Sequence, residues 1–130
     1  MRAIGYPEPA ALRLATAEAT PVSVHVATGF WDRFMGLMGQ ASMRPLTCVA
    51  FPRCASIHMF WMRFPIDVAW LGRPGEDGTC PVLGVELSLA PWRVAFGPRG
   101  TWGAAELPAG TISTAGQAVA LECPALVGGK

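Results

Sequence analysis

Short runs of alternating apolar and polar residues, separated by Gly and Pro, recur along most of this 130-residue chain. The clearest is Val22–Val26, in which valines alternate with Ser23 and His25. A period of two places the apolar side chains on one face of a strand. Further short strands are expected near residues 12–14, 46–51, 82–89, 101–107 and 118–121. The pattern therefore predicts a mainly β protein.

The most apolar stretch is Ser56–Leu71, and it is apolar on both of its faces. This is typical of strands that are covered on both sides. Pro65 has no N–H group to donate, so it divides the stretch into two short strands joined by a bend. Arg63 and Asp67 lie inside this apolar context, where an unpaired ion costs several kcal/mol, so both are expected to need partners.

One segment, Gly29–Met38, has the spacing of an amphipathic helix. Thr28 is suited to cap it, and Gly39 can end it. The expected fold is therefore a compact β-sandwich or partly open barrel of about seven to nine short, mainly antiparallel strands, with this helix covering one face or opening.

The length predicts a single domain over residues 1–130, with loosely ordered ends at 1–10 and 124–130. The net charge of +1 and the absence of a Lys/Arg run disfavour nucleic acid as a partner. No apolar run reaches the roughly 18 residues of a membrane span, and Tyr6–Pro9 stands where the core of a signal peptide would lie. The chain is therefore expected to be cytoplasmic.

The four cysteines are expected to be free thiols, since a cytoplasmic chain lies in reducing surroundings. Cys48, Cys54 and His58 do not have the spacing of a zinc site, and the chain has no C-x-x-C pair. Neither a metal nor a cofactor is expected.

Three motifs, in order, resemble those of a bacterial and archaeal family known as domain of unknown function 192, or uncharacterised ACR. The central motif is His58–Val68, with Arg33 and Gly36-Leu37-Met38 upstream and Glu106–Gly110 downstream. Two positions depart from the family pattern: Gln40, where the family usually has Arg, and Gln117, where it commonly has Asp. The resemblance implies a compact, mainly β fold with one helix, and it brings no established activity.

Polar side chains in apolar context form the candidate site. The ligand-binding candidates are His58, Trp61, Arg63, Asp67, Trp92, Arg93 and Glu106. In one interpretation Arg63 pairs with Asp67 or Glu106 as a buried architectural ion pair. In the other these residues line a cleft with an apolar floor. The apolar sequence on both sides of Arg63 favours the sealed pair.

Three functions are compatible with these residues. The first is a non-catalytic accessory or binding protein that holds a small polar or anionic ligand, or a protein partner, near Arg63, Asp67 and Glu106. The second is a small hydrolase that uses Asp67 or Glu106 with His58. The third is a structural or interaction protein whose working surface is an exposed apolar patch.

Overall fold

The computed structural model describes residues 8–14, 18–27, 45–60, 62–112 and 118–129. The expected helix Gly29–Met38 lies outside these residues. The described part of the chain contains the following elements: β1 (Glu8–Leu14), β2 (Ala19–Val26), β3 (Thr47–Phe51), β4 (Ser56–His58), β5 (Ile66–Leu71), β6 (Thr79–Leu89), β7 (Val94–Phe96), β8 (Gly103–Pro108), β9 (Ala118–Glu122) and the 3-10 helix η1 (Pro124–Gly129).

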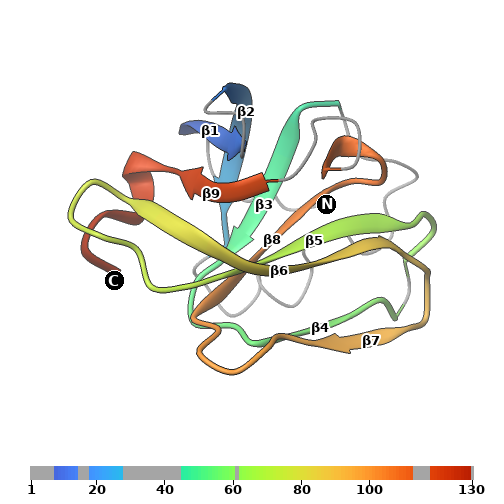
Figure 1. Ribbon diagram of the computed structural model, residues 1–130. Helices are drawn as coiled ribbons and strands as arrows, with labels where there is room; N and C mark the ends of the chain where they lie inside the picture. Colours follow the sequence, from blue (N-terminus) through green and yellow to red (C-terminus); the bar gives the residue numbers. More distant parts are fainter. Residues whose placement is uncertain (1–7, 15–17, 28–44, 61, 113–117, 130) are drawn as a thin grey trace.

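Seven of these strands form a closed barrel in the order β1-β2-β3-β8-β5-β6-β9. All neighbouring pairs in the barrel are antiparallel except β2 and β3, which are parallel. The two short strands β4 and β7 pair with each other and lie along one side of the barrel (Figure 1). The prediction of a mainly β fold of short, mainly antiparallel strands is therefore confirmed.

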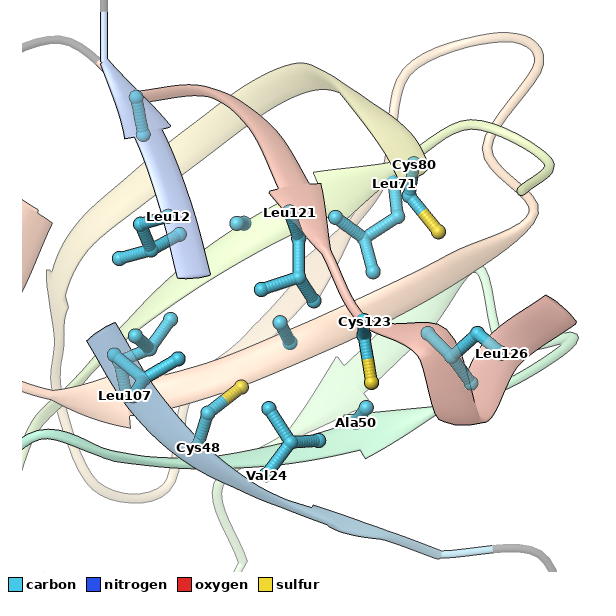
Figure 2. Close-up of a cluster of buried hydrophobic side chains, with 14 of the residues drawn as sticks. Leu12, Val24, Cys48, Ala50, Leu71, Cys80, Leu107, Leu121, Cys123 and Leu126 are labelled. Carbon is cyan, nitrogen blue, oxygen red and sulfur yellow. The ribbon is translucent and has the colours of Figure 1, made fainter. Parts of the chain in front are cut away.

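The barrel interior is the first of two hydrophobic cores. Figure 2 shows part of it, with side chains from β1, β2, β3, β5, β6, β8 and β9 pointing toward one another. Leu126 of η1 also contributes to this core, so the C-terminal segment, expected from the sequence to be loosely ordered, packs against the barrel.

The second core lies between the barrel wall and the β4–β7 sheet. It combines Val49 and Phe51 of β3, Val68 and Trp70 of β5, and Ile57 and Ala95 of the small sheet, among others. Alternate residues of β5 thus face two different cores, with Ala69 and Leu71 pointing into the barrel. This explains why all six residues of β5 are buried.

All four cysteines are free, and Cys48, Cys80 and Cys123 are buried in the barrel core. Burial raises the pKa of Cys80 to about 12 and raises that of Cys48 further. Cys54, which is only partly buried, is the most accessible of the four thiols.

Candidate functional site

Asp67 is a completely buried carboxylate with three backbone donors. Its Oδ1 accepts a hydrogen bond from the Ser88 N–H at 2.8 Å. Its Oδ2 accepts from the Gly110 and Ile112 N–H groups, each at 3.0 Å. A carboxylate that accepts several backbone N–H bonds needs no cationic partner to be stable in the interior. Asp67 therefore ties β6 and the turn after β8 to β5.

Local irregularities in the sheet bring these donors to Asp67. The register between β5 and β6 shifts between Ile66 and Val68, opposite Ser88, whose φ of 51° is left-handed. A residue with positive φ in one strand is typical of a bulge, which re-aims the backbone. Gly110, with a φ of 92°, turns the chain after β8 so that its amide and that of Ile112 point back at the same carboxylate oxygen.

Glu106 lies on the opposite face of the sheet from Asp67. Its register partners are Val49 on β3 and Val68 on β5, both members of the second core, whereas Asp67 lies opposite Leu107, in the barrel core. Glu106 is 6% exposed, and burial raises its pKa to about 8. No residue in the described part of the chain forms an ion pair or hydrogen bond with it. Glu106 is thus held in its neutral form at neutral pH.

Arg63 forms an ion pair with neither Asp67 nor Glu106, and its side chain is exposed. The expectation of a sealed Arg63 pair is therefore wrong. The physical reason is that Asp67 obtains its partners from backbone amides, while Arg63 points to the surface from the connection between β4 and β5. Trp61, another predicted site residue, lies outside the described residues.

The outer side of the small sheet carries a group of exposed rings. Ile57 and Ala95 face the second core, while their neighbours His58, Val94 and Phe96 face outward. The His58 and Phe60 rings have centroids 5.1 Å apart, and the Phe60 and Trp92 rings 6.0 Å apart. We call His58, Phe60, Trp92, Val94 and Phe96 the aromatic face.

Two members of the aromatic face are unusually exposed for their type: Trp92 is 56% exposed and Phe96 74%. Trp92 also has a φ of 70°, in the left-handed region that bulky residues rarely adopt. Two backbone hydrogen bonds hold this conformation, from the Trp92 N–H to the Met59 carbonyl and from the Met59 N–H to the Arg93 carbonyl, each 2.7 Å long. The fold therefore maintains a strained turn that leaves the indole in contact with solvent.

The two chain segments that contain the aromatic face have no acidic residue. The segments 52–66 and 90–105 contain Arg53, Arg63, Arg93 and Arg99 but neither Asp nor Glu, so their formal charge is +4. Since the whole chain is +1, the remainder carries −3. The segments that contain the aromatic face are therefore cationic, whereas the rest of the chain is acidic overall.

Of the predicted site residues, the structure brings His58 and Trp92 together on this layer, with Arg93 exposed beside Trp92. It leaves Asp67 and Glu106 in two separate cores. Among the described residues, no group of three or more His, Cys, Asp or Glu side chains is arranged to hold a metal ion. No helix in the described part of the chain is long and apolar enough to cross a membrane.

One surface feature was missed by the sequence analysis. A hollow of about 420 Å³ is lined by Arg53, Cys54, Ala55, Arg73, Gly100, Thr101 and Trp102. The available signal was that Arg53 follows Pro52 and Arg73 lies between Gly72 and Pro74, each just after a predicted strand. Nothing in the local sequence indicates that these two turns meet.

Comparisons with known proteins identify relatives of this chain. The family model described as DUF192, Uncharacterized ACR, matches residues 12–120. A crystal structure from Sinorhizobium meliloti 1021, provisionally described as a transcription regulator, is 21% identical, with a TM-score of 0.79 over 94% of this chain and 98% of that one. A protein of unknown function from Novosphingobium aromaticivorans DSM 12444 is 15% identical, with a TM-score of 0.74 over 90% of this chain and 84% of that one. No curated protein matches the chain. At these identities the two structures show a shared fold.

Proposed function

We propose that this chain, which belongs to the DUF192 family of uncharacterised ACR proteins, is a non-catalytic binding protein whose contact surface is the aromatic face. The partner is an acidic, partly apolar segment of another protein. The observation that carries this proposal is that exposed rings gather on two segments of the chain, 52–66 and 90–105, that contain arginines and no acidic residue.

The exposed rings support a contact surface because aromatic side chains supply most of the energy at protein interfaces. Trp and Tyr, together with Arg, are enriched among the residues whose truncation costs an interface most, and such residues cluster. Trp92 and Phe96 expose large apolar surfaces that a partner would remove from water. The left-handed turn at Trp92 supports the same conclusion, because backbone strain is concentrated at functional positions.

The charge of the layer supports an acidic partner. Arg63 and Arg93 are exposed on the connections that flank the aromatic face. A surface of one charge sign raises the association rate of oppositely charged partners and disfavours partners of the same sign. A segment that alternates Asp or Glu with bulky apolar residues would pack its apolar side chains on the rings and pair its carboxylates with the arginines.

The hydrolase alternative has less support from the geometry. A general base must come within hydrogen-bond reach of the proton that it removes. His58 is on the outer side of the small sheet, whereas Glu106 is buried in the core beneath that sheet, and the oxygens of Asp67 are occupied by three amides. Neither carboxylate therefore shares a solvent-connected site with His58.

The test is selection from a random linear peptide library displayed on phage, with the full chain immobilised, followed by titration of the enriched synthetic peptides. We expect peptides that combine acidic and bulky apolar residues. Phe96→Ser should weaken their binding by about tenfold or more. The control is Leu87→Ser, because Leu87 is a similarly apolar side chain, 51% exposed, on β6 and outside the aromatic face. Leu87→Ser should leave the affinity unchanged.

Two results would overturn the proposal. One is that no peptide is enriched, or that Leu87→Ser weakens binding as much as Phe96→Ser. The other is that a single-stranded oligothymidine binds the aromatic face more tightly than any selected peptide, since stacked rings and arginines also suit nucleic acid. This second probe is included because the Sinorhizobium meliloti neighbour is provisionally described as a transcription regulator.

A further inference from the structure

We infer that the hollow lined by Arg53 and Arg73 is a second binding site, for a small molecule that carries a phosphate or carboxylate group. It lies beyond the aromatic face, and none of the seven residues that line it belongs to that face. The inference does not depend on the proposed protein partner.

Three segments that are distant in the sequence build the hollow. They are residues 53–55 after β3, Arg73 after β5, and residues 100–102 before β8. Backbone hydrogen bonds join these segments: the Cys54 N–H donates to the Trp102 carbonyl at 3.0 Å, and the Trp102 N–H donates to the Leu71 carbonyl at 2.7 Å. The shape of the hollow is therefore set by backbone contacts between the segments, so a ligand would meet a largely preformed site.

The lining residues favour an anion. Two of the seven are arginines and none is acidic. Each guanidinium has five N–H donors in a planar fork that matches the oxygens of carboxylate and phosphate groups. Such charge-assisted, bidentate contacts are among the strongest hydrogen bonds available to a protein. Two arginines from different turns can thus approach one anionic group, or two groups of one molecule, from different sides.

Of the neutral side chains that line the hollow, those of Thr101 and Cys54 have partners within the protein, whereas the buried Trp102 Nε1–H has none in the described part of the chain. The Thr101 hydroxyl donates to the Pro98 carbonyl at 2.6 Å, and the Cys54 thiol donates to the Ser56 carbonyl at 3.0 Å. The two guanidinium groups supply the positive charge by which the hollow would select an anionic ligand. The volume of about 420 Å³ falls within the range of small-molecule sites and is too small for a folded partner.

One of the two arginines that line the hollow, Arg53, has a strained backbone conformation. Arg53 has a φ of 53°, which is left-handed, and it follows Pro52 in the turn after β3. A non-glycine residue in this region costs on the order of 1–3 kcal/mol and is typical of functional positions. A glycine would adopt this turn without that cost, yet the chain has an arginine there.

The experiment is a titration of the full ¹⁵N-labelled chain with inorganic phosphate, pyrophosphate and citrate, followed by amide chemical shifts. Phosphate and pyrophosphate report on a phosphate ligand, and citrate reports on a carboxylate ligand. We expect at least one probe to saturate, with shifts concentrated at residues 53–55, 73 and 100–102. Arg53→Gln and Arg73→Gln should each weaken that binding by about tenfold, as for loss of one charge-assisted contact. Retained amide spectra would show that each variant is folded.

The matched control is Arg99→Gln, since Arg99 is exposed in the neighbouring loop but does not line the hollow. It should change the affinity by less than about twofold. The inference is overturned if no probe saturates, if Arg99→Gln weakens binding as much as the other two, or if both lining variants bind normally. Phe96→Ser should not alter anion binding, so failure here is distinguishable from failure of the aromatic face.

Discussion

The buried Glu106 makes the stability of this protein depend on pH in a way that one substitution can remove. Burial raises the pKa of this carboxyl group from its ordinary value of 4.5 to about 8. Below pH 4.5 the side chain is protonated in both the folded and the unfolded chain. Between pH 4.5 and about 8 the unfolded chain releases the proton while the folded chain keeps it.

The sign and size of the effect follow from this difference. Because the folded state binds one more proton in that window, the free energy of unfolding falls as the pH rises, by about 1.4 kcal/mol per pH unit. Over the whole interval the loss is on the order of 5 kcal/mol, and about 3 kcal/mol of it has occurred by pH 7. Such a loss is a large part of the 5–15 kcal/mol typical of a domain.

Glu106→Gln tests this reasoning, because Gln has nearly the same shape and does not ionise. The free energy of unfolding would be measured by urea denaturation at several pH values between about 5 and 9, with tryptophan fluorescence as the signal. We expect the wild-type chain to lose stability with rising pH more steeply than the variant, and the variant to be the more stable of the two above pH 7. The other titrating groups are common to both chains and cancel in the comparison.

The control substitution is Glu86→Gln. Glu86 is an exposed carboxylate on β6, opposite Val68 in the register, so removing its charge should leave the pH dependence of wild type unchanged. Parallel wild-type and Glu106→Gln curves would refute the reasoning, since they would mean that Glu106 has its ordinary pKa in the folded protein.

Three further predictions concern other buried and exposed groups. Asp67→Ala should lower the free energy of unfolding, measured by urea denaturation, by on the order of 3–5 kcal/mol, because three backbone N–H groups lose their acceptor. The control is Glu122→Gln, which breaks the partly exposed ion pair with Arg13 and should lower it by less than about 1 kcal/mol. Arg63→Ala should change the free energy of unfolding by less than about 1 kcal/mol, because the side chain is exposed; a larger loss would mean that Arg63 has a structural partner. Iodoacetamide should label Cys54 alone in the native protein and all four cysteines after unfolding without reductant, as counted by mass spectrometry; rapid native labelling of a second thiol would contradict the buried positions.

The class of fold could be predicted from the pattern of apolar residues alone. The period-two pattern of Val22–Val26 predicted a strand with one buried face. The two apolar faces of residues 66–71 predicted a strand that is covered on both sides, because a strand between two cores must be apolar on both faces. The family was identified from three motifs together: His58–Val68, Arg33 with Gly36-Leu37-Met38, and Glu106–Gly110. The four free thiols also followed, because the spacing of the cysteines offered no disulfide framework.

Which polar groups meet could not be predicted from the sequence, because it depends on how the strands pair. Asp67 and Glu106 are both polar residues in apolar strands, yet the register of β5 with β8 places them on opposite faces, and a shift of one residue would reverse this. The partners of Asp67 are backbone amides from residues 88, 110 and 112, which have no side-chain signal in the sequence. Likewise, the turns that carry Arg53 and Arg73 come together because β3 and β5 lie on either side of β8 and both end beside its first residues. Periodicity reports which side of an element is buried, whereas contacts between distant polar groups depend on strand order, register and bulges.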